Sequence, residues 1–247
     1  MSVWMCAPSK RPTLIAQGIV NEWEALGYKT AIWRDTGDDP VLCDLLIRGE
    51  YPGHYDCANR IVRAVFSHDP KCDWVVCASD DTEPDKTHTP RTIAEQCSAY
   101  FEEPGALIEG AEARLWVNAT FGVMQPTGDR FANGSIDRIC GSPWIGREFA
   151  RRMYGGRGPW FPEYTHMFGD EELQNVALKL GVLWQRPDLI HLHHHFMRTH
   201  EGIDSPAQKI EVPPHLVEAN SRQHWDRYRA LFNARKEAGF PGHEPIA

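Results

Sequence analysis

The first 80 residues alternate between apolar and polar blocks that predict strands and helices in turn. Short apolar runs over residues 3–7, 29–33 and 73–78 are typical of buried strands. Residues 14–26 and 55–67 carry apolar side chains at helical spacing, and a glycine follows the first of these two segments. Strands that alternate with helices indicate an α/β domain with a mostly parallel central sheet.

The pattern is less regular in the second half of the chain, where elements are separated by turn-rich stretches. Strand-like segments are predicted over residues 115–125, 182–184 and 189–196. Helices are predicted over residues 145–154 and 170–180. After residue 202 prolines interrupt the chain, and one charged helix is expected over about 219–238. One domain with an attached tail accounts for this order.

Composition and charge narrow the class of protein. Of the 247 residues 42% are hydrophobic and 24% charged, which is typical of a folded globular chain. The net charge of −8 argues against a surface built mainly for nucleic acid or anionic membrane. No apolar run approaches the ~18 residues that a membrane span needs. The 7 cysteines are scattered and form no C-x-x-C pair, which predicts a reduced, cytoplasmic protein.

Ser79 and the acidic pair Asp80 and Asp81 directly follow the apolar run over 73–78. In open α/β sheets ligands bind beyond the carboxyl ends of the strands, so these side chains are expected in the binding crevice. Adjacent carboxylates repel each other unless a cation compensates them, and Mg²⁺ or Mn²⁺ does so while bridging to phosphates. The alternative is a polar turn or a helix N-cap.

A second group is the histidine run His191–His195, in which four of five residues are histidine. Strand alternation would place His191, His193 and His195 on one face, with His194 on the other. Imidazole is a common ligand of transition metals, which makes this run a candidate metal site. A solvent-facing polar strand is the alternative.

A third group is Asp170, Glu171 and Glu172 at the start of a predicted helix. Acidic residues in a first turn interact favourably with the helix dipole, and this explains them without any catalytic role. A carboxylate at a loop–helix junction can also act as a general base toward an acceptor hydroxyl.

Taken in order, these motifs resemble those of nucleotide-sugar glycosyltransferases of the GT-A fold, in the branch similar to family two. The matching segments lie between residues 3 and 195: Val3–Pro12, Trp33–Asp35, Ala58–Arg60, Trp74–Pro84, Gly141–Phe149, Phe168–Gln174 and Ile190–His193. The resemblance implies one Rossmann-like GT-A domain over residues 1–200, with a nucleotide-binding half to about 110 and an acceptor half beyond it. Residues 201–247 would form a tail whose helix packs on the domain.

The resemblance also implies roles for particular residues. The nucleotide sugar would be held by Pro8, Ser9, Arg11, Asp35, Arg60 and Asp80. Asp81 would bind Mn²⁺ or Mg²⁺ together with His191, His193 or His195. Ser79 departs from the first Asp that the family often carries there. Asp170 would be the general base of an inverting transfer, and the acceptor would contact Trp144, Arg147 and Glu171.

A UDP-sugar is the expected donor, while the acceptor is left open between a glycan, a small molecule and a hydroxylated base in DNA. The DNA hypothesis depends on a run of arginines near the predicted acceptor helix: Arg138, Arg147, Arg151, Arg152 and Arg157. Trp144, Trp160 and Phe161 would stack on bases or sugars. A solvated helix face explains the same arginines. Two other classes stay open: a metal-dependent hydrolase using the histidines and aspartates, and a non-catalytic sugar-nucleotide-binding module.

Overall fold

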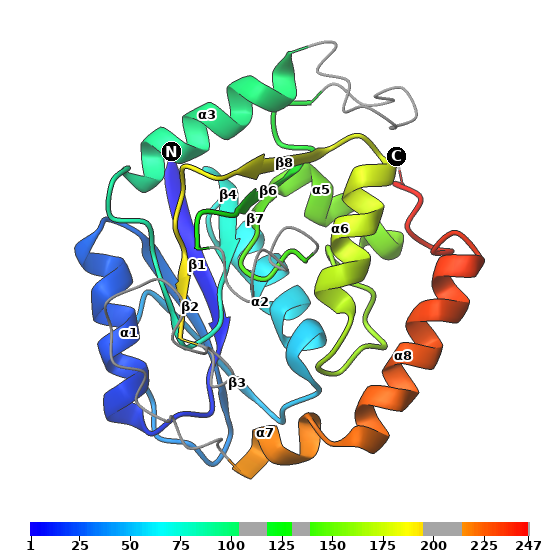
Figure 1. The fold of residues 1–247 in the computed structure, drawn as a ribbon. Helices are drawn as coiled ribbons and strands as arrows, with labels where there is room; N and C mark the ends of the chain where they lie inside the picture. The colour runs from blue at the N-terminus through cyan, green and yellow to red at the C-terminus, as the bar shows by residue number, and fades with distance from the viewer. Residues whose placement is uncertain (104–117, 130–138, 195–213, 247) are drawn as a thin grey trace.

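The structure is a computed structural model that describes residues 1–103, 118–129, 139–194 and 214–246. Its centre is a seven-stranded sheet (Figure 1). The strands are β1 (Ser2–Pro8), β2 (Lys29–Asp35), β3 (Leu45–Gly49), β4 (Cys72–Cys77), β6 (Val123–Pro126), β7 (Trp144–Gly146) and β8 (Leu183–Arg186). A second, two-stranded sheet pairs β5 (Thr82–Glu83) with β9 (Leu192–His193).

The strand order in the large sheet is β3-β2-β1-β4-β7-β6-β8. Strand β7 runs antiparallel to both of its neighbours, and the other pairings are parallel. From β1 the chain first moves to one side, through β2 and β3, and then crosses back so that β4 pairs with the other side of β1. The strand order therefore reverses between β1 and β4, the position at which open α/β sheets bind ligands. The mixed α/β fold with a mostly parallel sheet agrees with the sequence prediction.

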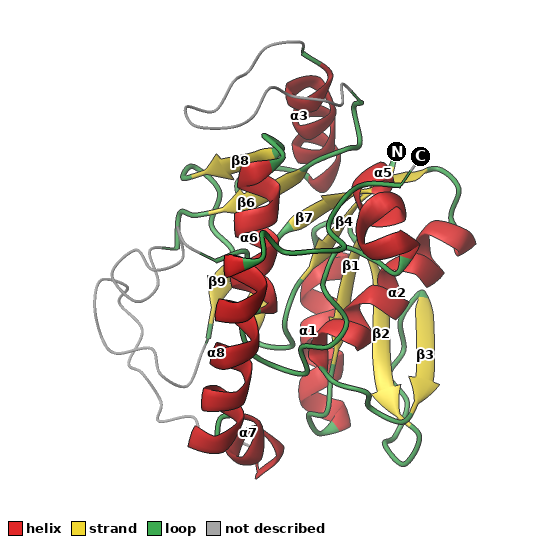
Figure 2. Cartoon of the chain, turned by 90° about the vertical axis from the view of Figure 1, so that its right-hand side faces the viewer, coloured by secondary structure: helices red, strands yellow, loops and turns green. Residues whose placement is uncertain are grey.

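Helices connect and cover the strands. They are α1 (Thr13–Ala25), α2 (His54–His68), α3 (Pro90–Glu102), α5 (Arg147–Arg152), α6 (Gly169–Lys179), α7 (Pro214–Ala219) and α8 (Arg222–Glu237), with a short 3₁₀ turn, η2 (Met153–Gly156). Helix α2 packs on β1, β2 and β4, while α1 contacts β2 and α3 contacts β1. Helix α8 lies beside α6 in both views of the chain (Figures 1 and 2).

The structure differs from the predicted elements in several places. Strand β3 and helix α3 were not predicted. The predicted helix over 145–154 begins two residues later, because its first residues belong to the buried strand β7. The predicted strand over 189–196 reduces to β9 within the described residues. The helix predicted over about 219–238 corresponds to α8, which the Ser221 hydroxyl caps, and the separate short helix α7 before it was not predicted.

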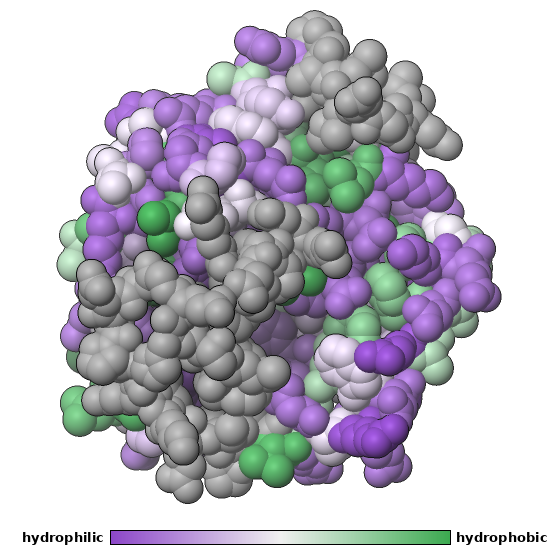
Figure 3. Space-filling model, viewed as in Figure 1, coloured by the Kyte–Doolittle hydropathy of each residue, from purple (hydrophilic) through white to green (hydrophobic). Residues whose placement is uncertain are grey.

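Tryptophan, which is abundant in this chain, goes largely into the core. Trp4, Trp23, Trp74 and Trp144 are among the largest fully buried side chains. Each buried aromatic ring removes a large apolar area from water, which stabilises the packing of helices on the sheet. On the face shown in Figure 3, hydrophilic residues predominate over the described surface and apolar residues appear as small separate groups.

All 7 cysteines are unpaired, and six of them are buried. Within the part of the chain that the structure describes, no helix is both long enough and apolar enough to cross a bilayer.

Candidate active site

A cavity of about 280 Å³ opens beyond the carboxyl ends of β1, β2 and β4. Its walls include the residues that directly follow β1 and β4, so it lies at the point where the strand order reverses. Eight of the residues predicted to bind the donor or metal or to act as base line it together: Pro8, Ser9, Arg11, Asp35, Asp80, Asp81, Asp170 and His193. Trp160, predicted to stack on a base or sugar, lines it as well. The fold thus gathers side chains that are up to 185 positions apart in the sequence, from Pro8 to His193.

Arg11 links the two carboxylates of the acidic pair. Its Nε donates to Asp80 Oδ1 at 2.9 Å and its Nη2 to Asp81 Oδ2 at 3.1 Å. The Ser9 hydroxyl donates to Asp80 Oδ2 at 2.8 Å, so both oxygens of Asp80 are engaged within the protein. Burial raises the pKa of Asp80 despite the nearby guanidinium. Asp80 therefore orders the turn after β1, and Asp81 presents its second oxygen toward His193.

A buried arginine shapes the turn that carries Ser9 and Arg11. Arg34 in β2 is 2% exposed, and its Nη1 donates to the backbone oxygens of Ser9 at 3.1 Å and Arg11 at 2.7 Å. Charged donors make strong hydrogen bonds to backbone carbonyls, which fixes this loop against β2. The prolines on either side of the turn, Pro8 and Pro12, restrict it further.

Asp35 closes the cavity at the end of β2. Its Oδ2 pairs with Lys10 Nζ at 2.6 Å, while its Oδ1 is buried and has no hydrogen-bond partner among the described residues. A buried acceptor without a donor is rare in folded proteins and marks a place where a ligand N–H or O–H can bind. Arg60, in contrast, is exposed; it pairs with Asp56 at 2.8 Å and lies over the Trp33 ring, which itself lines the cavity.

Asp170 enters the cavity from the first turn of α6. The chain reaches this position through Phe168, whose φ of 68° lies in the left-handed region that side chains with a Cβ rarely adopt. Burial raises the pKa of Asp170, although hydrogen bonds from the Glu171 backbone N–H and the Tyr55 hydroxyl oppose this shift. A carboxylate with a raised pKa is a better proton acceptor near neutral pH than an exposed one.

The histidine run separates into different environments. His193 Nε2 lies 3.1 Å from Asp81 Oδ1 at the cavity. His194 Nε2 pairs with Glu83 Oε1 at 2.6 Å. His191 is buried in the core, with its ring against those of Trp23 and Trp144, and burial lowers its pKa to about 4. The structure therefore does not bring His191 to Asp81, and His195 lies outside the described residues.

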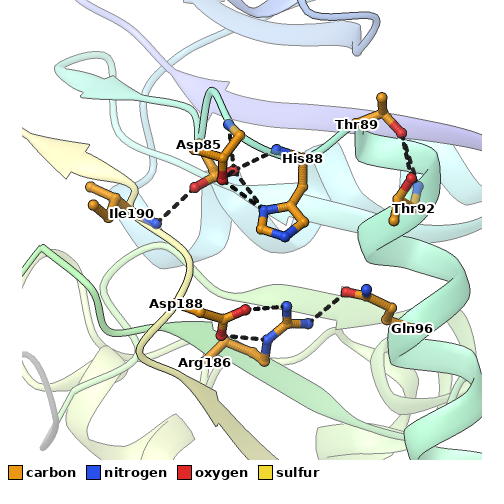
Figure 4. A network of polar contacts seen from close by, with 9 residues as sticks. Asp85, His88, Thr89, Thr92, Gln96, Arg186, Asp188 and Ile190 are labelled. Carbon is orange, nitrogen blue, oxygen red and sulfur yellow. Dashed lines mark hydrogen bonds and ion pairs between the residues drawn. The ribbon is translucent and has the colours of Figure 1, made fainter.

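A polar network around Asp85 and Arg186 holds the segment that precedes His193 (Figure 4). Asp85 is buried and accepts hydrogen bonds from the backbone N–H groups of Thr87, His88 and Ile190. Arg186 donates to Asp188 and to the Gln96 side chain of α3. The hydrogen bond between Ile190 and Asp85 holds the chain just before β9 against the loop after β5. This contact helps to place His193 beside Asp81.

Two of the predicted acceptor residues are placed elsewhere. Trp144 is fully buried within the sheet, opposite Val76. Arg147 donates to the backbone oxygens of Phe66 at 2.9 Å and Cys72 at 2.8 Å, at the amino end of β4 and far along the strand from Asp80. The third, Glu171, is partly buried beside Asp170, and its backbone N–H donates to the Asp170 carboxylate.

The other arginines of this segment also contact the protein itself. Arg151 and Arg152 both pair with Glu148, at 2.8 and 3.0 Å, and Arg157 donates to the backbone oxygen of Tyr154. Arg138 lies outside the described residues. Charges held in such pairs are weak evidence for a phosphate-binding surface.

Several cavity residues were not predicted from the sequence. They are mainly aromatic or imidazole side chains and thiols: Cys6, Trp33, Tyr51, His54, Tyr55, Cys77, Cys140 and His166. Tyr51, His54 and Tyr55 follow β3, so a correct prediction of β3 would have placed them at the carboxyl edge of the sheet. Burial, with a contribution from neighbouring His166, lowers the pKa of His54 to about 4, so this ring is neutral at pH 7.

The cavity residues fit a divalent cation that is held jointly by protein and ligand. Among the described residues, no group of three or more His, Cys, Asp and Glu side chains could hold a metal ion. Mg²⁺ commonly takes only one or two protein ligands and completes its shell with phosphates and waters. Asp81 Oδ1 and His193 Nε2 lie 3.1 Å apart, so these two side chains would be the protein ligands of such a cation.

The charges that line the cavity also favour a bound divalent cation. The described cavity lining carries four carboxylates, Asp35, Asp80, Asp81 and Asp170, against the two cationic side chains Lys10 and Arg11. A diphosphate would meet net repulsion in such a cavity unless a cation accompanied it.

Comparison with known proteins gives only distant similarities. No protein-family model matches the chain, and no curated protein matches it. Among solved structures, "A197 from STIV" is 12% identical, with a TM-score of 0.46 over 78% of this chain and 85% of that one. A glycosyltransferase involved in glycosylation of the major capsid of PBCV-1 is 9% identical, with a TM-score of 0.33 over 60% of this chain and 61% of that one. These similarities are too distant to assign an activity, so function has to be derived from the site.

Proposed function

We propose that this protein is a glycosyltransferase that moves a sugar from a nucleotide-sugar donor, expected to be a UDP-sugar, to an acceptor hydroxyl. The observation that carries the proposal is that Asp170 opens onto the same cavity as the Asp81–His193 pair. The same cavity can therefore take a diphosphate with its cation at the Asp81–His193 pair and a proton at Asp170. The location at the reversal of strand order supports a nucleotide ligand.

The donor would lie along the carboxyl ends of β1, β2 and β4. The Asp35 oxygen without a partner can accept a hydrogen bond from the nucleoside, and the Trp33 and Tyr51 rings offer flat apolar surfaces. Asp81 and His193 would hold Mn²⁺ or Mg²⁺, which supplies positive charge to the departing diphosphate when bound. Arg11 keeps Asp81 in place through its ion pair.

Asp170 would act as the general base. Its carboxylate takes the proton of the acceptor hydroxyl while the hydroxyl oxygen attacks the anomeric carbon, and the bond to the diphosphate breaks with its electron pair. A single displacement of this kind inverts the configuration at the anomeric carbon. The burial that raises the pKa of Asp170 favours this role.

A metal-dependent hydrolase is less well supported. Such an enzyme retains its ion on protein ligands in the resting state. The described residues supply the pair Asp81 and His193, and no larger ligand group. A cation that arrives with the donor fits this arrangement better.

The proposal is tested by thermal unfolding of the full chain with UDP-glucose, UDP-N-acetylglucosamine, GDP-mannose or CMP-sialic acid, each with and without Mn²⁺. Ligands that bind the native state raise the apparent stability, so we expect an upward shift with one nucleotide class that requires the metal. A shift with Mn²⁺ alone that no nucleotide increases would favour the hydrolase. No shift under any condition would exclude a donor of these classes.

Two variants separate donor binding from chemistry. Asp81→Asn is expected to remove the metal-dependent part of the thermal shift. Asp170→Asn is expected to keep the shift and to lower transfer by roughly 10²–10⁴-fold, the usual contribution of a general base. The exposed Glu163→Gln serves as the matched charge control. If Asp170→Asn transferred sugar at the native rate, Asp170 would not be the base.

A further inference from the structure

Tyr55 lies in the first turn of α2 and its ring packs directly on the N-terminal residue of α6, Gly169. A Cβ built on Gly169 would lie 2.6 Å from the Tyr55 ring, closer than atoms can approach. Glycine at this position therefore allows the phenol to reach the start of α6. Tyr55 is 5% exposed and lines the cavity beside Asp170.

The hydrogen bonds of Tyr55 determine the direction of its hydroxyl proton. The backbone N–H of Asp170 donates to the Tyr55 oxygen at 3.2 Å, so the phenol oxygen acts as an acceptor there. Its own proton then donates to Asp170 Oδ1 at 3.1 Å. The backbone N–H of Glu171 donates to the same Oδ1 at 3.0 Å. One carboxylate oxygen of Asp170 thus receives two donors from directions fixed by α2 and α6.

We propose that Tyr55 is a positioning residue for Asp170: by engaging Oδ1, it orients the carboxylate so that Oδ2 receives the proton of the acceptor hydroxyl. This role rests on the proposed function of Asp170 as general base. In the step itself the acceptor O–H bond breaks, its proton passes to Oδ2, and the oxygen bonds to the anomeric carbon as the diphosphate leaves with the electron pair. Tyr55 gives up no proton in this sequence.

The surroundings of Asp170 favour a donor role for Tyr55. Burial and the nearby Asp170 charge raise the pKa of Tyr55 well above its ordinary value, so its hydroxyl stays protonated. Besides Tyr55 from α2, the groups that act on Asp170 are its neighbour Glu171, the Cys140 thiol and His193 from β9. The Tyr55 hydrogen bond stabilises the charged carboxylate of Asp170 and so lowers its pKa, against the effect of burial. Removal of this hydrogen bond should therefore raise the pKa of Asp170.

The test is an NMR titration of the full chain carrying ¹³C-carboxyl aspartate, without metal or nucleotide. Asp170→Asn identifies the resonance. In Tyr55→Phe, which keeps the ring on Gly169, we expect the pKa of Asp170 to rise by about one pH unit, the size of one lost hydrogen bond to a charged group. Tyr164→Phe is the matched control, because that buried hydroxyl donates to Glu172 and not to Asp170. An Asp170 pKa in Tyr55→Phe equal to that of the native chain overturns the proposal.

A kinetic measurement distinguishes this proposal from the proposed function. With the donor found by thermal unfolding, the acidic limb of the pH–rate profile should move upward in Tyr55→Phe together with the Asp170 pKa, and remain in place in Tyr164→Phe. If the NMR shift occurs but Asp170→Asn retains full transfer, the contact is real and the base assignment fails. If Asp170→Asn loses transfer while Tyr55→Phe leaves both the pKa and the profile unchanged, the base stands and the role of Tyr55 is rejected.

Discussion

Arg235, near the end of α8, forms a two-pronged ion pair with Glu172 in the first turns of α6. Its Nε lies 2.8 Å from Oε2 and its Nη2 lies 2.7 Å from Oε1. Both side chains are buried, and the hydroxyls of Tyr154 and Tyr164 also donate to Glu172. The ion pair thus joins the tail helix α8 to α6. Helix α6 also carries Asp170, which lies two residues before Glu172.

Arg235→Ala is expected to lower the free energy of unfolding by about 3–5 kcal/mol, because it leaves the Glu172 charge buried without its partner. Urea unfolding followed by circular dichroism measures the difference. Arg222→Ala, at a fully exposed position of the same helix, should change stability by less than ~0.5 kcal/mol. Equal losses of unfolding free energy in the two variants would show that the buried ion pair stabilises the fold no more than a surface arginine does.

Arg147→Met is expected to reduce stability without reducing transfer. The guanidinium donates to three partly buried backbone oxygens, those of Phe66, Asp69 and Cys72, and its loss removes these hydrogen bonds. We expect a loss of about 1.5–3 kcal/mol in the free energy of unfolding. Activity should be native at temperatures where the variant is folded. A specific rise in acceptor KM with unchanged stability would restore the acceptor-binding role that the sequence resemblance implies for Arg147.

Asp69 is a carboxylate whose hydrogen bonds make the stability of the fold depend on pH in the acid range. It accepts hydrogen bonds from the Ser2 hydroxyl at 2.6 Å and the Trp4 indole at 3.0 Å, which join the end of α2 to β1. The Ser2 hydrogen bond, with further help from Trp4, Lys71 and Lys29, lowers the pKa of Asp69 well below its usual value. Because the folded pKa lies below the unfolded one, the stabilisation is present above the unfolded pKa of ~3.9 and is lost as pH falls below it.

Asp69→Asn should therefore flatten the pH dependence of stability. Between pH 5 and pH 3 the native chain is expected to lose more free energy of unfolding than the variant, because asparagine does not titrate. Urea midpoints at several pH values measure both slopes, and the exposed Asp226→Asn is the control. Parallel slopes for the native chain and Asp69→Asn would remove Asp69 from the acid response.

The sequence predicts most of the strands that build the cavity, because buried central strands are continuous apolar runs. Strands β1 and β4 are of this kind, and the polar residues at their ends lie where parallel topology requires them. Strand β3 escaped prediction because it lies at the sheet edge and is only partly buried, so Leu45, Leu46 and Ile47 show no alternation or long run. Because β3 was not predicted, Tyr55 was not expected to line the cavity.

Side-chain placement was harder to predict than strand order. Strand alternation puts His191 and His193 on one face, but β9 contains two residues, and His191 lies before it in the core. Arg147 follows a buried strand and carries a long side chain, which reaches backbone oxygens at the far end of β4. Neither outcome depends on a local pattern, because Arg147 contacts residues 75 and 81 positions away and His191 packs on the rings of Trp23 and Trp144.

The cavity wall draws on both ends of the chain, from Cys6 in β1 to Asn220 just before α8. During synthesis the N-terminal strands emerge first, and the pocket cannot close until nearly the whole chain has left the ribosome. Contacts so distant in sequence form slowly, since a long loop must be ordered before they stabilise anything. Binding of a ligand in this pocket would therefore indicate that the whole chain has folded. A bound nucleotide would also protect segments near both ends of the chain from proteolysis.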